Sequence, residues 1–197
     1  MQVPRAENII RPENLDSGIF KGWYAQVKMN GQYLVVTVAK DKTVSALDRH
    51  GKKPAWNFNP NTRALWARLP PGVYCAELLH AKVKEIRNTF YLHDIIEADG
   101  KTLLGVPYRD RYRLLIKYLE PFAVYNGRAA YVPYWQYGDS FWAAKNFTNI
   151  SFKGLFDSLI RPEEEGLVLK NPDAKLTHNN QQGWTVKCRR PTKNFQF

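Results

Sequence analysis

The stretch YAQVKMNGQYLVVTV, residues 24–38, is rich in β-branched and aromatic residues and predicts a strand over residues 23–39. Successive side chains of a strand point to opposite faces, so Gln26 and Lys28 share one face and Val27 lies on the other. Taken alone, a lysine in this position is most simply a solvent-facing residue. Its role therefore depends on what the other strands place beside it.

Three other predicted strands also carry charges among apolar residues. Lys187 and Arg189 share a face in WTVKCRR, Glu165 and Lys170 enclose an apolar segment in EGLVLK, and Glu77 lies within VYCAELL. Each charge alone fits a surface residue, a salt-bridge partner or a basic edge strand. If these strands line one pocket, their cations and carboxylates together suit a nucleotide phosphate and a divalent metal ion.

The remaining pattern predicts an α+β fold, with antiparallel sheets flanked by helices and one domain over residues 1–197. Helices are expected over residues 108–121, where Pro121 ends the apolar periodicity, and over residues 149–160. Further strands are expected at residues 43–48, 73–81, 165–172 and 183–190. Another is expected over residues 89–104, with a turn at 99–100. Residues 130–135 are expected to form a strand or a loop.

The composition favours a polyanionic partner. The chain has 197 residues, 44% of them hydrophobic, a net charge of +11 and a pI near 9.6. Such a balance points first to nucleic acid and second to an anionic membrane surface, although general solubility is a plain alternative. Two cysteines and four histidines predict neither a disulfide framework nor a zinc site. With no secretion leader and no apolar run of membrane-spanning length, we expect an intracellular, cytoplasmic protein without a membrane partner.

Six short motifs, in order, resemble those of the covalent nucleotidyltransferases, the superfamily of ATP-dependent DNA ligases, RNA ligases and mRNA-capping guanylyltransferases. A lone Lys-x-Asn-Gly is weak evidence, whereas six elements in order are specific. They are Lys28-Met29-Asn30-Gly31, Arg49-His50-Gly51, Glu77 in its strand, YLHDII with Asp94, the Glu165–Lys170 segment EGLVLK, and Lys187-Cys188-Arg189.

The resemblance implies a fold in which the sheets form a nucleotide-binding groove like that of ATP-grasp proteins. It also implies a reaction. Lys28 would attack the α-phosphate of ATP as a neutral amine and form lysyl-AMP. Lys187 and Lys170 would grip the α-phosphate, and Arg49 would contact the ribose or the 5′-phosphate of a nick. Glu77 and Glu165 would hold the ribose and Mg²⁺ or Mn²⁺.

The AMP would then pass to a 5′-phosphate, and a 3′-hydroxyl would seal the strand, as DNA replication and repair require. The other nucleotide-binding positions that the resemblance implies are Gln26, His93 and Arg189. Gln26 stands where the family often has an acidic residue, and Asn30 replaces the commoner Asp. His93 stands where ligases usually carry the aromatic residue that stacks on adenine, and Phe90 and Tyr91 are alternatives for that role.

The chain ends eight residues after Arg189, so we expect a monomeric ligase domain without an OB-fold domain. Either that domain was left off, or this is a minimal one-domain ligase, or another partner supplies its function. Such a compact form would suit a virus or phage. Nicked duplex DNA is the favoured partner, with an RNA ligase as one alternative. A non-catalytic nucleic-acid-binding protein that kept the fold is another.

Overall fold

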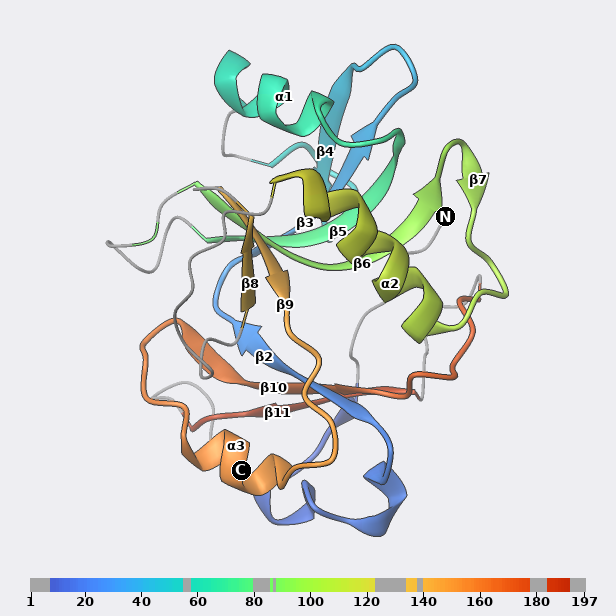
Figure 1. The fold of residues 1–197 in the computed structure, drawn as a ribbon. Helices are drawn as coiled ribbons and strands as arrows, with labels where there is room; N and C mark the ends of the chain where they lie inside the picture. The colour runs from blue at the N-terminus through green and yellow to red at the C-terminus, as the bar shows by residue number, and fades with distance from the viewer. Residues whose placement is uncertain are drawn as a thin grey trace.

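The computed structural model describes residues 8–54, 58–79, 86, 88–122, 134–137, 140–177 and 184–191. Within these ranges the chain forms two β-sheets with a few helices around them, as Figure 1 shows. This confirms the expected α+β class. Most neighbouring strands run antiparallel, as expected, but the pairs β6–β9 and β1–β11 run parallel.

The larger sheet has seven strands, with the order β4-β3-β5-β6-β9-β8 and with β7 paired to β6. Its strands are β3 (Gln32–Val38), β4 (Val44–Asp48), β5 (Gly72–Leu79), β6 (Thr89–Ala98), β7 (Lys101–Thr102), β8 (Tyr134–Tyr137) and β9 (Phe141–Ala144). The strands expected at 43–48, 73–81 and 89–104 all lie here, although residues 80 and 81 fall outside the described part. Of the uncertain segment 130–135, only the last two residues are described, and they begin β8.

The smaller sheet has four strands in the order β1-β11-β10-β2. They are β1 (Asn8–Ile9), β11 (Thr185–Arg189), β10 (Glu164–Lys170) and β2 (Tyr24–Met29). This sheet therefore joins segments from the two ends of the described chain. The two strands expected at 165–172 and 183–190 are its centre.

The single strand expected over residues 23–39 is wrong. It divides into β2 and β3, which belong to different sheets, and Asn30 and Gly31 connect them. Gly31 fits tightly there, because a Cβ atom at this position would lie 2.8 Å from the carbonyl oxygen of Leu78. The apolar pattern is continuous across the break because both halves are buried, so periodicity could not reveal the change of sheet.

Helix α2 (Tyr108–Leu119) confirms the expected helix over 108–121, and a 3₁₀ turn, η3 (Glu120–Phe122), follows it. Helix α3 (Phe152–Asp157) is shorter than the expected 149–160, because Ser151 caps its first turn by accepting from the Gly154 amide. Helix α1 (Pro60–Ala67) was not predicted, although the Asn59-Pro60 pair is a start signal that the sequence offers. Two more 3₁₀ turns, η1 (Pro12–Asn14) and η2 (Gly18–Phe20), precede β2.

The described residues form three hydrophobic clusters, one of which both sheets share. One cluster lies between the larger sheet and helices α1 and α2, where Trp66 packs against Phe90 and Phe141 with ring centroids 5.1 and 4.9 Å apart. The second lies under the smaller sheet, around Phe152 and Phe156 of α3.

A third cluster, around Val35, Val73 and Ile96, covers part of the opposite face of the larger sheet. The rest of that face and the opposite face of the smaller sheet line the cavity described next.

Candidate functional site

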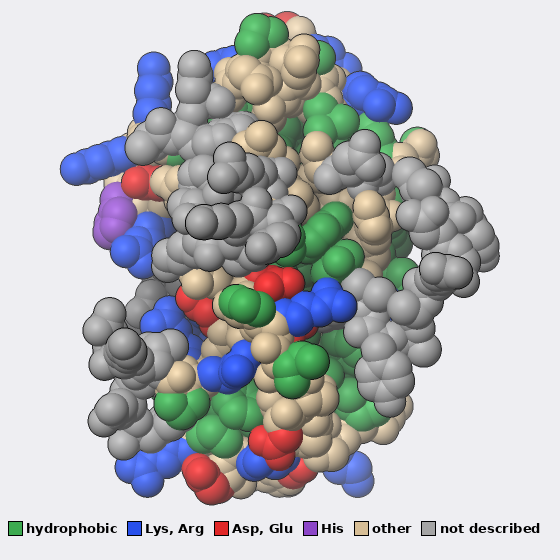
Figure 2. All heavy atoms as spheres, turned by 90° about the vertical axis from the view of Figure 1, so that its left-hand side faces the viewer, with side chains coloured by type: hydrophobic (Ala, Val, Ile, Leu, Met, Phe, Trp, Pro, Cys, Tyr) green, Lys and Arg blue, Asp and Glu red, His purple; other side chains and the backbone are tan. Residues whose placement is uncertain are grey.

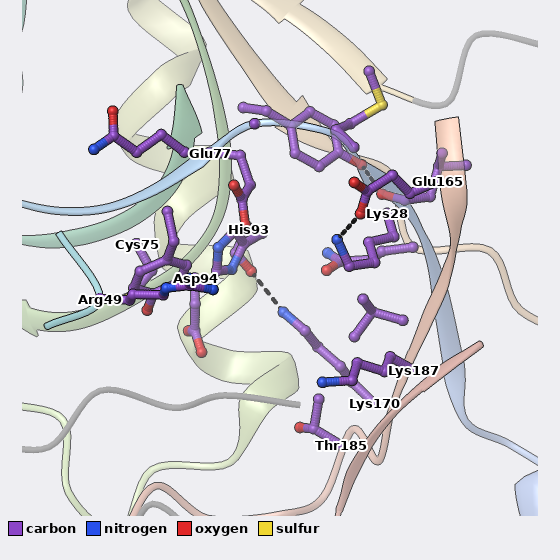
Figure 3. Close-up of a pocket in the computed structure, with 18 of the residues that line it drawn as sticks. Lys28, Arg49, Cys75, Glu77, His93, Asp94, Glu165, Lys170, Thr185 and Lys187 are labelled. Atoms are coloured by element: carbon purple, nitrogen blue, oxygen red, sulfur yellow. Dashed lines mark hydrogen bonds and ion pairs between the residues drawn. The ribbon is translucent and has the colours of Figure 1, made fainter. Parts of the chain in front are cut away.

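A cavity of about 530 Å³ lies between the two sheets. The structure brings every predicted site residue to its wall: Gln26, Lys28, Arg49, Glu77, His93, Glu165, Lys170, Lys187 and Arg189. Figure 2 shows acidic and basic side chains gathered together near the middle of one face, and Figure 3 shows the labelled side chains of the cavity. Residues from five different strands and one loop therefore converge on one place.

Strand alternation places the first two of these residues as expected. Gln26 and Lys28 of β2 line the cavity. Val27 and Met29 also border it, but their side chains belong to the hydrophobic core beneath. The side chain of Lys28 is only 18% exposed, so it is not the solvent-facing lysine that a lone residue would suggest. Gln26 is deeper still, at 2% exposed.

Lys28 forms an ion pair with Glu165, in which its Nζ atom donates to Oε2 (Figure 3). Glu165 and Lys170 are five positions apart on β10, and an unbroken strand would point them to opposite faces. An irregularity in the pairing of β10 with β2, between Glu164 and Gly166, shifts the register and lets both residues line the cavity.

Gly166 is the residue that permits this shift. Its φ is +144°, and a Cβ atom there would lie 2.0 Å from the carbonyl oxygen of Cys188 on β11. Only glycine tolerates both conditions. This local geometry explains why the EGLVLK motif has a glycine at this position.

The basic wall comes from β11 and from the turn after β4. Thr185, Lys187 and Arg189 all line the cavity, as their shared face predicts. Arg49 is exposed at the end of β4, where its Nε donates to His50 Nε2 at 3.0 Å. The cations thus lie around a cavity that Lys28 also enters.

Lys170 lines the cavity and is 6% exposed. Its Nζ donates to the carbonyl oxygen of His93 at 3.1 Å and to the hydroxyl of Tyr108 at 3.4 Å. Burial lowers the pKa of Lys170 to about 8, against an opposing attraction from Asp94. This amine is therefore held by neighbours on the cavity wall.

His93, the expected stacking residue, and Tyr91, one of its alternatives, line the cavity, whereas Phe90, the other alternative, does not. The His93 ring lies beside Tyr33, with centroids 5.7 Å apart, and burial together with the Lys170 charge lowers the pKa of His93 to about 3. A neutral ring can stack on a purine. Phe90 is 1% exposed within the core, away from the cavity. Tyr91 does line the cavity, but its hydroxyl donates to the Val27 carbonyl at 2.9 Å.

Asp94 follows His93 and has a structural partner. Arg111 of α2 donates to its two oxygens at 3.0 and 2.9 Å, and Arg111 is fully buried. Burial opposes ionisation of Asp94, but the guanidinium prevails and holds its pKa below the usual range. The pair joins β6 to α2 behind the cavity.

Sequence reasoning missed several cavity residues as candidates: Tyr33, Trp184, Thr185 and, behind the wall, Tyr108. Tyr108 is fully buried at the start of α2, and its contacts come from residues 82, 62 and 15 positions away. Helical periodicity marks such a residue only as core. Thr185 lies two residues before Lys187 and therefore on the same face of the strand, which is the signal that could have identified it.

Both cysteines are free and buried, which agrees with the expectation of no disulfide. Cys75 lines the cavity, and burial raises the pKa of its thiol to about 12. Among the helices of the described residues, none has the length and apolar character needed to cross a membrane.

No protein-family model matches the chain, and no curated protein matches its sequence. Solved structures do match. The ligase domain of LigD from M. tuberculosis covers 95% of this chain at 19% identity with a TM-score of 0.68. A mycobacterial DNA ligase D complexed with ATP and MES gives a TM-score of 0.67 at 19% identity over 95% of the chain. A Lig E DNA ligase gives 0.59 at 16% identity over 95% of the chain.

The chain spans 59% and 60% of the length of the two ligase D structures and 69% of the Lig E structure. At these identities the likeness shows the fold. The chain thus has the nucleotidyltransferase fold found in ATP-dependent DNA ligases, as the motifs predicted.

Proposed function

We propose that this chain is the nucleotidyltransferase domain of an ATP-dependent polynucleotide ligase, and that it seals breaks between a 5′-phosphate and a 3′-hydroxyl. One observation carries the proposal. In a fold shared with DNA ligases, Lys28 enters a cavity that also holds Glu165, Lys187 and Arg189. Nucleotidyl transfer to a lysine requires a nucleophilic amine, cations that bind phosphate and a carboxylate, and residues of each kind line this cavity.

In the first step, the lone pair of the Lys28 Nζ attacks the α-phosphorus of ATP. The bond from that phosphorus to the bridging oxygen breaks, pyrophosphate leaves, and a phosphoramidate joins Lys28 to AMP. The attacking nitrogen must also lose a proton. Glu165 already accepts from this nitrogen, so it is the acceptor that the geometry offers. Lys187 and Arg189 would stabilise the negative charge on the phosphates.

A divalent cation fits the carboxylates Glu77 and Glu165, which both line the cavity. Among the described residues there is no group of three or more side chains able to hold a metal ion by themselves. Two carboxylates suit Mg²⁺ or Mn²⁺ that is completed by nucleotide phosphates and water. When bound, such an ion offsets phosphate charge as pyrophosphate leaves.

In the second step, a 5′-phosphate oxygen attacks the phosphorus of the lysine adduct, the phosphorus–nitrogen bond breaks, and the amine of Lys28 leaves with a proton that Glu165 would return. In the third, a 3′-hydroxyl attacks the 5′-phosphate and loses its proton to solvent, and the phosphoanhydride bond breaks to release AMP. Arg49 is exposed at the cavity mouth, where a nicked strand would approach. The net charge of +11 supports binding to phosphate backbones. The likeness to DNA ligases supports DNA as the favoured strand.

The decisive experiment is intact mass measurement after incubation with ATP and Mg²⁺. The protein should gain one AMP, and Lys28→Ala should abolish the gain. Lys153→Ala is the matched control, because Lys153 is an exposed lysine paired with Asp157 on α3 and should leave the adduct unchanged. Absence of an adduct, in protein also checked for preloaded AMP, would remove the proposal and favour a non-catalytic binder.

Substrate choice is then read from sealing of nicked duplexes that carry DNA or RNA on either side of the break. We expect the all-DNA nick to be sealed fastest, and preferential sealing of RNA would indicate an RNA ligase instead. Binding to the nicked duplex should weaken steeply as salt rises. A flat salt response would argue against the basic face as the binding surface.

A further inference from the structure

Strand β8 carries an exposed tryptophan outside the cavity. Trp135 is 50% exposed, and neither Trp135 nor Lys145, the residue that follows β9, lines the cavity. Among the described strands β8 pairs only with β9, so it forms one edge of the larger sheet (Figure 1). Single exposed apolar residues are common on protein surfaces, so a binding role for Trp135 depends on its surroundings.

The indole ring of Trp135 is held in place from behind. Its N–H group donates to the hydroxyl of Tyr112 on α2, and that hydroxyl donates in turn to the Ala144 carbonyl oxygen at 2.7 Å. Burial raises the pKa of the Tyr112 phenol above its ordinary value, so the hydroxyl keeps the proton that it donates. Helix α2 and strand β9 thus fix one edge of the ring, and the exposed part presents a rigid, flat surface.

A lysine cation lies over the same ring. The Nζ atom of Lys145 is 4.2 Å from the centroid of the Trp135 ring, which is a cation–π contact. Burial lowers the pKa of Lys145 from its ordinary value, and none of the carboxylates in the described residues forms an ion pair with it. An ammonium group that has lost part of its water and has no such partner favours an anion from outside the chain.

The neighbouring residue of β8 repeats this combination of an aromatic ring and a cation. The Tyr134 hydroxyl accepts a hydrogen bond from Arg161, whose side chain is exposed. The Tyr134 ring stacks on Trp142 of β9, with centroids 3.8 Å apart and planes 5° apart. This edge of the sheet therefore interleaves aromatic rings with cations, the composition that proteins use to bind single strands of nucleic acid.

A flat ring beside a cation matches the two parts of one nucleotide. The base offers a π-face to the ring, and the phosphate offers negative charge to the lysine. The bases of a duplex are already stacked on one another, so only an unpaired base can stack on Trp135. An anionic membrane surface would instead call for a wide apolar face with several cations around it.

We propose that Trp135 and Lys145 form a binding platform for single-stranded nucleic acid, in which one base stacks on the indole ring and the adjoining phosphate contacts the lysine. The platform has no groups that read base edges, so it takes strands of any sequence. It goes beyond the proposed function, because sealing a nick takes place at the cavity and needs no unpaired base. Its place outside the cavity suits unpaired nucleotides that flank a break.

The test measures binding by fluorescence anisotropy with two labelled strands of equal length, an oligothymidine and a strand of abasic sites. Both strands carry the same phosphates, but only the first has bases. Trp135→Ala should weaken binding to oligothymidine about tenfold and leave binding to the abasic strand unchanged. Trp135→Phe keeps an aromatic ring and should retain most of the affinity. Leu47→Ala is the matched control, because Leu47 is 44% exposed on β4, at the other edge of the same sheet, and should change neither affinity.

Lys145→Ala tests the contribution of charge. It should weaken binding to both strands to a similar extent, because both strands keep the phosphate that the lysine contacts. It should also lower the slope of log affinity against log salt by about 0.7, the value for one phosphate contact on a single strand. Lys153→Ala removes a partly exposed lysine that is paired with Asp157, and it should leave the slope unchanged.

Equal losses on the two strands in Trp135→Ala, or no loss on either, would overturn the inference. If Trp135→Ala does not fold, Trp135→Leu keeps an apolar side chain without the flat ring and should show the same base-dependent loss. A dimer in sedimentation, or binding to vesicles of phosphatidylcholine and phosphatidylserine, that depends on Trp135 while oligothymidine binding does not would assign this edge to another partner and also overturn it.

These variants should still gain one AMP in the mass measurement, because they leave the cavity unchanged. Failure of the platform therefore leaves the proposed function standing. Failure of the unaltered protein to form any adduct would overturn the proposed function and leave the platform standing.

Discussion

The Nζ atom of Lys28 is bonded to the Oε2 atom of Glu165, which lies 137 positions further along the chain. The two residues face each other because β2 and β10 are antiparallel neighbours and because the irregularity before Gly166 brings Glu165 to the cavity. This pair joins the proposed nucleophile to a proton acceptor before any nucleotide is bound.

Glu165→Gln should slow adduct formation by about a hundredfold, because an amide cannot take the proton of the attacking nitrogen. Single-turnover rates measured by mass spectrometry test this, with the exposed Glu13→Gln as control. A rate equal to that of the unaltered protein would exclude Glu165 as the acceptor. If excess Mg²⁺ restores the rate, metal binding is the larger part of its role.

Gly166→Ala should destabilise the protein by about 3 kcal/mol or more and also reduce adduct formation, because a Cβ there meets the Cys188 carbonyl at 2.0 Å. Urea unfolding measures the first effect. Gly18→Ala is the matched control, since nothing lies within 4 Å of its added Cβ. Equal unfolding midpoints for the two variants would contradict the steric explanation.

Asp94→Asn should cost about 3 to 5 kcal/mol of unfolding free energy, because it leaves the buried Arg111 guanidinium without a counter-charge. The control is Asp110→Asn, which breaks an exposed pair with Arg113 on the same helix and should cost at most about 1 kcal/mol. Comparable losses in the two variants would show that the Asp94 pair is not decisive for stability.

Lys170 should make stability depend on alkaline pH. Its folded-state pKa of about 8 lies below the ordinary lysine value of 10.5, so between these values the unfolded chain binds more protons. The unfolding free energy contributed by this group therefore rises with pH across that window, by about 3 kcal/mol at most, and its cost is fully present below pH 8. Denaturant unfolding of the unaltered protein and of Lys170→Met should diverge from pH 8 upward. Parallel curves would contradict the lowered pKa.

The sequence predicted this site well where local rules apply. Period-two alternation placed Gln26 with Lys28, and Lys187 with Arg189, because the face of a strand residue depends only on its neighbours. Glu165 needed the motif, since alternation alone sets it opposite Lys170. The bulge that unites them depends on contact between Gly166 and another strand.

Features that depend on tertiary contacts could not be predicted from local sequence patterns. The division between β2 and β3 escaped the apolar pattern because both strands are buried. The helix over 108–121 was found, but Arg111 on its buried side breaks the amphipathic pattern and is explained only by Asp94. Tyr108 was read as an ordinary helical residue because its polar partners lie on other strands.

The smaller sheet combines strands from early and late in the chain, and this affects the order in which the fold can form during synthesis. Strand β2 pairs only with β10 among the described strands, so on a ribosome it waits as an open edge until the later strand emerges. Strands β3 to β6 are near neighbours in sequence and can pair first, because closing short loops is faster than closing long ones. The cavity between the two sheets is therefore the last part of the fold to be completed. A nascent chain therefore carries Lys28 long before strands β10 and β11 complete the cavity around it.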